Sequence, residues 1–201
     1  MTSNYRIERL LWGSGYRFIA GSDEVGRGAI AGPIVSAAVI LQKNYFFGDI
    51  RDSKQLTPFG RKKLFKKIVS DCVCWSVFFI SPRLIDKMGL SSANVFAMAG
   101  ALRRLKIKPQ MVLTDYYELK EVSCPVLALI KGDYRSATVA AASIIAKVVR
   151  DGVMEDYSVL YPQYRFDKNK GYGTREHLLE VDSAGLSPIH RKSFRINSWA
   201  K

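Results

Sequence analysis

The chain has 201 residues, 48% of them hydrophobic and 24% charged, which excludes a fibrous repeat or an intrinsically disordered chain and predicts one folded domain. Its 31 Lys and Arg residues outnumber 18 Asp and Glu residues, so the net charge is +13. Such a balance predicts a polyanionic partner such as nucleic acid. A basic surface that serves only solubility is the alternative.

Five segments have the composition and length of β-strands. Runs of β-branched, aromatic and other apolar residues predict strands at residues 16–22, 33–41, 72–80, 111–113 and 126–130. The first three are expected to be connected as hairpins and the last two by crossovers. This order predicts a mixed five-stranded sheet flanked by helices.

Helical patterns fill the intervals between these strands. Thr57 and Pro58 are the expected N-cap and first turn of a helix through the basic run at residues 61–67, which should give it a solvated face or, as the alternative, a surface that follows a duplex. Further helices are expected at residues 91–105, 136–156 and 174–182, the last with Thr174 as its cap.

Neither a membrane span nor a disulfide framework is expected. The longest apolar stretch, residues 29–41, is too short to cross a bilayer, and the N-terminus has no signal-peptide layout, so we expect a soluble cytoplasmic protein. Cys72, Cys74 and Cys124 cannot all pair, and Cys72 and Cys74 alternate on one expected strand, which predicts a reducing compartment and no zinc site.

Four acidic residues fall where expected strands end. Asp23 and Glu24 follow the first strand, Asp115 the fourth, and Asp133 the fifth. If the first and fourth strands are parallel neighbours, these carboxylates emerge at one edge of the sheet. Clustered carboxylates favour hard cations such as Mg²⁺ or Mn²⁺, and two such ions can support phosphodiester hydrolysis. The alternative is that each is an ordinary solvated turn residue.

A Gly-Arg-Gly turn, Gly26-Arg27-Gly28, comes directly after the first acidic pair. Its glycines allow close approach of the backbone to a sugar or phosphate, and Arg27 can bind a phosphate with two parallel hydrogen bonds. Equally, the glycines can simply form the turn between two strands.

Six motifs succeed one another between residues 17 and 194. They are DEVGRG (23–28) with AGP (31–33), DSKQL (52–56), KGD (131–133), ASIIAKVVRD (142–151), KGYGT (170–174) with His177, and GLSPIHRKSF (185–194). Together, in this order, they resemble ribonuclease HII, the type 2 ribonuclease H family. The related type 3 enzymes usually carry an extra N-terminal domain and lack the arginine of the glycine turn, so the resemblance is to type 2.

The resemblance implies a ribonuclease H-like fold and an endonuclease that cuts RNA in RNA·DNA hybrids and at ribonucleotides embedded in duplex DNA. Cleavage would leave a 3′-hydroxyl and a 5′-phosphate, in DNA replication and repair. By the family's motif, the catalytic and metal-binding residues, with two Mg²⁺ or Mn²⁺ ions, would be Asp23, Glu24, Asp115 and Asp133. Relatives often have Gly after the third carboxylate, whereas this chain has Tyr116, so Glu118 is an alternative to Asp115.

The resemblance also implies how the substrate is selected. Gly26, Arg27 and Gly28 would read the 2′-hydroxyl, the group that distinguishes RNA from DNA, and Tyr172 would stack on the deoxyribose at the junction. Further candidate substrate contacts, each with a purely structural or solvent-exposed alternative, are Lys54, Ser143 and Lys147. His177 and His190 have no spacing partner for zinc and are expected to serve hydrogen bonding or structure.

Other functions remain open on the residues alone: a nucleic-acid-binding module without catalysis, or a nuclease of the same fold that cuts DNA, such as a junction resolvase.

We expect one domain over residues 1–201, with a core at about 17–156 and a helical, substrate-contacting region at about 157–201. A monomer is expected. A sliding clamp is a candidate partner, although residues 195–201 show no clamp-binding motif apart from Trp199.

Overall fold

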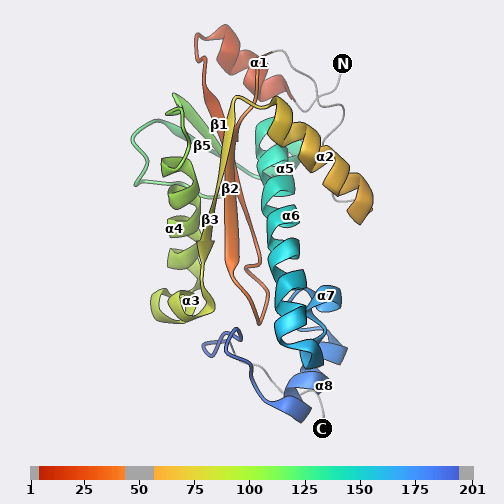
Figure 1. Cartoon of the computed structure of the whole chain (residues 1–201). Coiled ribbons are helices and arrows are strands. Elements are labelled where there is room, and N and C mark those ends of the chain that lie inside the picture. Colours follow the sequence, from red (N-terminus) through yellow and green to blue (C-terminus); the bar gives the residue numbers. More distant parts are fainter. Residues whose placement is uncertain (1–4, 44–56, 195–201) are drawn as a thin grey trace.

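The structure, a computed structural model, describes residues 5–43 and 57–194. In them a five-stranded sheet lies between helices (Figure 1). The strands are β1 (Ile19–Val25), β2 (Ile34–Ile40), β3 (Cys74–Ile80), β4 (Met111–Asp115) and β5 (Val126–Leu129). The helices are α1 (Arg6–Gly13), α2 (Pro58–Asp71), α3 (Pro82–Met88), α4 (Leu90–Arg103), α5 (Gly132–Arg135), α6 (Ala137–Leu160), α7 (Phe166–Asn169) and α8 (Arg175–Ala184), with a 3₁₀ turn, η3 (Pro162–Tyr164).

The sheet is mixed, with the strand order β3-β2-β1-β4-β5. The pairs β1–β2 and β2–β3 are antiparallel, whereas β4 runs parallel to β1 and β5 parallel to β4. The mixed five-stranded sheet expected from the sequence is therefore confirmed. The expected hairpin between β2 and β3 is wrong, because α2 lies between these two neighbouring strands in the chain.

Each face of the sheet is covered by one long helix. Alternate side chains of a strand point to opposite faces. Ile19, Ala37 and Leu113 belong to the core formed with the alanine-rich α6, while Ala20, Ala38 and Val112 belong to the core formed with α4. In Figure 1, α4 and α6 lie on either side of the strands. The central strands β1, β2 and β4 are thus largely buried on both faces, whereas the edge strands β3 and β5 keep exposed side chains such as Trp75 and Leu127.

Local capping explains several boundaries. Thr57 accepts a hydrogen bond from the Gly60 amide at 3.2 Å, and Thr174 accepts one from the His177 amide at 3.3 Å, so both expected N-caps are confirmed.

The strand expected at residues 16–22 instead begins at Ile19 and includes Asp23 and Glu24. The helix α1, which was not predicted from the sequence, precedes it.

Two further expectations need correction or fall outside the described residues. Cys72 follows the last residue of α2 and Cys74 begins β3, so the two do not share a strand; the three cysteines are free. Lys54 and Trp199 lie outside the described residues. None of the helices in the described ranges is both long and apolar enough to cross a bilayer.

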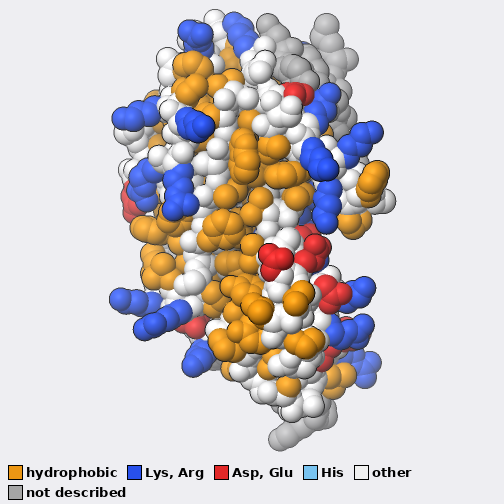
Figure 2. Space-filling model, viewed as in Figure 1, with side chains coloured by type: hydrophobic (Ala, Val, Ile, Leu, Met, Phe, Trp, Pro, Cys, Tyr) orange, Lys and Arg blue, Asp and Glu red, His pale blue; other side chains and the backbone are white. Residues whose placement is uncertain are grey.

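The basic helix α2 presents most of its charge to solvent. Lys62, Lys63, Lys66 and Lys67 are exposed, whereas Arg61 is only partly so. On the face shown in Figure 2, Lys and Arg side chains gather along the margins, while the middle is largely hydrophobic. The expected solvated face of this helix is confirmed for its lysines.

Candidate active site

The strand register brings the expected carboxylates together. β1 and β4 pair in parallel with Ser22 opposite Thr114, so the next residues, Asp23 and Asp115, leave the sheet at the same level. Beyond them, the end of β5 leads through Lys131 into the short helix α5, which carries Asp133. The carboxyl ends of three neighbouring parallel strands thus supply the acidic residues, as is usual for sites in open α/β sheets.

The first two carboxylates leave β1 on opposite faces of the sheet. Asp23 lies on the α6 side, where Ser143 forms a hydrogen bond with it, and Glu24 lies on the α4 side, where the buried Asn94 forms a hydrogen bond with it. Burial, followed by repulsion from Glu24, raises the pKa of Asp23 well above its usual value. Burial also raises the pKa of Glu24, against the opposing effect of Arg27.

The other two carboxylates are held close to one another by the chain between them. The Gly132 amide donates to Asp115 Oδ1 at 2.8 Å, which links the end of β4 to the first residue of α5. Asp133 follows directly and is 9% exposed. Tyr116 and Lys131, next to this pair, have φ of 71° and 56°, in the left-handed region that such residues rarely adopt. The backbone is therefore bent sharply on both sides of the site.

All four carboxylates line a single cavity of about 420 Å³. Glu118, the alternative to Asp115, is exposed and does not line it. The remaining residues of the lining are Val25, Arg61, Ser143, Ile144 and Lys147. The predicted Ser143 and Lys147 are therefore at this cavity, Lys147 with an ion pair to Asp151 at 2.8 Å. Arg61 was predicted as part of a solvated face or, alternatively, of a surface that follows a duplex, but not as a residue of this cavity.

The donor set fits a hard cation. Carboxylate oxygens are the ligands that Mg²⁺ and Mn²⁺ prefer. Glu24 Oε2 is buried without a hydrogen-bond partner, an arrangement that is costly unless something positive meets it. In the described part of the chain, no three Asp, Glu, His or Cys side chains are already gathered in the arrangement of a metal site. Filling the site would therefore require the carboxylates lining the cavity to turn toward a shared ion.

The glycine turn and Tyr172 meet beside this cavity. Ala29, next to the turn, forms an antiparallel bridge with Tyr172, and the Ile30 and Ala31 amides donate to the Gly171 carbonyl at 2.8 and 3.1 Å. The Arg27 guanidinium lies 5.4 Å from the centre of the Tyr117 ring. Two groups predicted to contact one substrate are thus adjacent, although about 145 residues separate them in the sequence.

His177 and His190 form a hydrogen-bonded pair that also contacts the backbone of Tyr172. The Ser187 amide donates to His190 Nδ1 at 2.9 Å, so a neutral His190 carries its proton on Nε2. That proton bridges the 3.1 Å to His177 Nε2, which leaves His177 Nδ1 to donate to the Tyr172 carbonyl at 2.9 Å. Both rings therefore serve hydrogen bonding.

Comparison with known proteins identifies the family of this chain. The family model for ribonuclease HII matches residues 20–197. The chain belongs to the ribonuclease HII family. It is 45% identical to ribonuclease HII of Caldicellulosiruptor saccharolyticus, over 96% of this chain and 94% of that protein. It is therefore a metal-dependent ribonuclease H, an endonuclease that hydrolyses phosphodiester bonds of RNA in hybrids.

Solved structures of the family have the same fold. Ribonuclease H2 of Pyrococcus horikoshii superposes with a TM-score of 0.76 at 30% identity, over 89% of this chain and 94% of that one. The ribonuclease HII of Archaeoglobus fulgidus, solved as a complex with PCNA, gives a TM-score of 0.75 at 28% identity, over 87% and 92% of the two chains. The ribonuclease H-like fold implied by the sequence motifs is thus confirmed.

Proposed function

We propose that this ribonuclease HII incises duplex DNA on the 5′ side of an embedded ribonucleotide, as well as the RNA strand of hybrids, and so removes ribonucleotides during replication and repair. The products are a 3′-hydroxyl and a 5′-phosphate. The observation that carries the proposal is the position of the glycine turn and Tyr172, joined through the Ala29 bridge beside the cavity that four carboxylates line.

Asp23, Glu24, Asp115 and Asp133 are proposed as the catalytic and metal-binding residues. Two Mg²⁺ or Mn²⁺ ions bound there would supply activation of a water and stabilisation of the leaving oxygen. The raised pKa of Asp23 and the unpartnered Glu24 Oε2 support a cation in this place, since a positive charge would relieve both. The Ser143 hydroxyl and the Asn94 amide hold the first two carboxylates in orientation.

Selection of the substrate is proposed for the turn of Gly26, Arg27 and Gly28. Arg27 and Gly28 are exposed, so their amides and the Arg27 side chain can meet a sugar and its phosphate. Reading the 2′-hydroxyl here would restrict cleavage to the ribonucleotide. Tyr172 is proposed to stack on the neighbouring deoxyribose, which positions the RNA-to-DNA junction over the carboxylates.

Further contacts follow the lining of the cavity. Ser143, Lys147 and Arg61 line it, and the two basic side chains are placed to neutralise backbone phosphates. We place other duplex contacts in the C-terminal region, residues 157–201. Lys54 is also proposed as a substrate contact and lies outside the described residues. We propose that the enzyme is a monomer that engages a sliding clamp, as suggested by the relative solved with PCNA.

The test is cleavage of an end-labelled DNA duplex with one ribonucleotide beside an all-DNA duplex of the same sequence, in Mg²⁺, Mn²⁺ or EDTA. We expect one metal-dependent cut, 5′ of the ribonucleotide. Cutting of both duplexes would instead indicate a DNA nuclease. Binding without cutting would indicate a nucleic-acid-binding module and would contradict the catalytic assignment.

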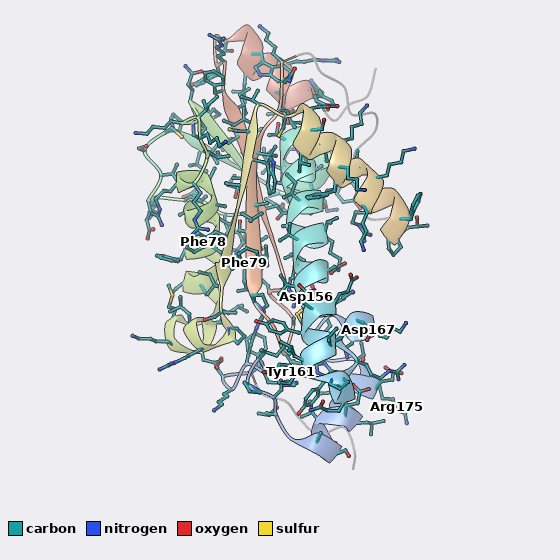
Figure 3. The ribbon with its side chains drawn as sticks, viewed as in Figure 1. Phe78, Phe79, Asp156, Tyr161, Asp167 and Arg175 are labelled. Atoms are coloured by element: carbon teal, nitrogen blue, oxygen red, sulfur yellow. The ribbon has the colours of Figure 1, made fainter. Side chains whose placement is uncertain are left out.

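Substitution separates catalysis from binding. Asp133→Asn and Asp23→Asn should each abolish cleavage while leaving duplex binding largely intact, since each removes one negative charge from a predicted metal site. Asp156→Asn is the matched control: Asp156 lies exposed on α6, outside the cavity lining, and should leave cleavage unchanged (Figure 3). Normal turnover by either site variant would refute the assignment of these carboxylates.

A further inference from the structure

Two arginines are buried beneath the glycine turn although the protein as a whole is strongly basic. Arg150 of α6 and Arg191 are both 0% exposed, so neither side chain can reach nucleic acid at the surface. Burial of a guanidinium is costly unless its donors are satisfied. Their hydrogen bonds show what holds them: both groups donate to main-chain carbonyl oxygens.

Arg191 spans both ends of the turn. Its Nη2 donates to the Gly26 carbonyl at 2.7 Å and to the Gly32 carbonyl at 2.9 Å. Its Nη1 donates to the Arg27 carbonyl at 2.9 Å, and its Nε also donates to Gly32, at 3.1 Å. One planar guanidinium therefore fixes two consecutive peptide planes, at Gly26 and Arg27, and a third at Gly32, further along the chain.

Arg150 supports the turn indirectly, through the residues that follow it and through Lys170 next to the Tyr172 segment. It donates to the carbonyls of Pro33, Ala31 and Lys170, at 2.9, 3.2 and 2.8 Å. Gly26 has φ of 94°, and a Cβ at that position would lie 2.2 Å from Arg150 Nε, so the arginine fills the space that the glycine leaves. The Arg150 guanidinium also lies 5.3 Å from the centre of the Tyr172 ring.

These bonds determine where the amides of the turn point. In a trans peptide the N–H points opposite to the C=O of the same unit. Since Arg191 binds the carbonyls of Gly26 and Arg27, the amides of Arg27 and Gly28 must point away from it. Arg27 and Gly28 are exposed on that side. The buried guanidinium thus aims two amide donors at the surface where the substrate sugar is proposed to lie.

We propose that Arg150 and Arg191 are positioning residues for substrate selection: they hold the glycine turn, and its placement relative to Tyr172, in the orientation that reads the ribose. The proposal rests on the function proposed above for this turn. It assigns selectivity to two side chains that do not touch the substrate. Lysine cannot replace them, because a single ammonium nitrogen cannot bind three separated carbonyls in one plane.

The test measures selectivity independently of the amount of folded enzyme. For each variant we would measure KM for the one-ribonucleotide duplex and Ki for the all-DNA duplex as competitor, because neither constant depends on the concentration of active enzyme. For Arg191→Lys we expect the ratio Ki(DNA)/KM(ribonucleotide) to fall at least fivefold, with a lower kcat. Arg150→Lys, which leaves the Arg191 bonds in place, should lower the ratio less.

Leu102→Ala is the control for loss of stability alone. Leu102 belongs to α4 and is buried between this helix and the sheet, away from the turn. Its truncation should lower the melting temperature while keeping the ratio Ki(DNA)/KM(ribonucleotide) within twofold of the wild-type value. If both arginine variants keep this ratio within twofold of the wild-type value, the proposal is overturned. It is also overturned if neither variant folds, because the role of the two arginines would then be structural.

The same assay separates this inference from the function on which it rests. If the wild-type enzyme cuts both duplexes or shows equal Ki and KM, the proposed ribonucleotide selection itself fails. If the wild-type enzyme selects and the arginine variants select equally well, only the positioning role fails.

Discussion

The contact between α6 and the middle of β1 leads to a sharp prediction about Gly21. A Cβ built on Gly21 would lie 2.2 Å from the Thr138 carbonyl carbon, 2.3 Å from its oxygen and 2.5 Å from the Val139 amide nitrogen. All three are backbone atoms of α6, so no side chain can rotate to make room. Ordinary carbon contacts need about 3.5 Å, so Gly21→Ala would push the helix from the sheet by more than about 1 Å.

The cost follows from what must move. Overpacking a core typically costs about 1–3 kcal/mol, and an obstacle made of backbone places this change at or above the upper end. Gly152→Ala is the matched comparison, since Gly152 lies inside α6 with nothing within 4 Å of its Cβ position. There the same substitution should stabilise by about 0.5–1 kcal/mol, because alanine restricts the unfolded chain and favours the helix.

The assay is thermal unfolding of both variants beside the wild-type protein. For a chain of this size about 1 kcal/mol corresponds to about 2–4 °C in Tm. Gly21→Ala should therefore lower Tm by about 6–12 °C or more, and Gly152→Ala should raise it by about 1–4 °C. A Gly21→Ala variant within about 2 °C of wild type would refute the reasoning, since it would mean that α6 does not press on β1 as the structure shows.

Three other groups give testable outcomes. Burial, and then His177, lowers the pKa of His190 to about 4, so the protein should lose stability as pH falls from 6.5 toward 4. By linkage this loss is at most about 3 kcal/mol. In urea unfolding across this pH range, His190→Asn should show a flatter dependence of stability on pH than the wild-type protein. Burial raises the pKa of Glu8, so the wild-type protein should lose stability relative to Glu8→Gln as pH rises from 4.5 to 7, measured in the same way. Asn94→Ala removes the hydrogen bond that holds Glu24 and should lower kcat about tenfold or more with KM little changed, in steady-state cleavage.

The sequence predicted those features that depend on neighbouring residues. Strand composition located the five strands, and side-chain caps located the beginnings of α2 and α8, because a cap and its helix lie within three residues of one another. The placement of Asp23 beside Asp115 also followed, since the carboxyl ends of parallel strands meet at one edge. Local pattern was sufficient for each of these.

Features that depend on distant partners were missed. The helix α1 is anchored by Glu8, whose carboxylate accepts hydrogen bonds from Ser136 and Thr138 at the start of α6, some 130 residues further along the chain. Asn94 sits in an apolar helix pattern, and only the fold reveals that it contacts Glu24. A sequence pattern carries no information on such pairs, because neither partner is unusual in its own segment.

The burial of two arginines was also not predictable from the sequence. A net charge of +13 predicts cations on the surface, and the lysines of α2 are there, but Arg150 and Arg191 are buried. What permits their burial is a set of carbonyls that the turn leaves without strand partners, up to 165 residues away in the chain. Charge composition therefore predicted the partner class while leaving the role of these two arginines undetermined.

The residues proposed for catalysis and those proposed for substrate selection lie on different elements, which gives a crossed expectation. The carboxylates belong to strand ends and α5, while the glycine turn is bound by Arg191, near the end of the described chain, and packs against Arg150 of α6. Asp133→Asn should therefore abolish turnover yet keep tighter binding of the ribonucleotide duplex than of the all-DNA duplex in direct binding measurements. Arg191→Lys should do the reverse: it should still turn over, at a lower kcat, while that preference shrinks. Equal loss of both properties in both variants would show that the turn and the carboxylates act as one unit.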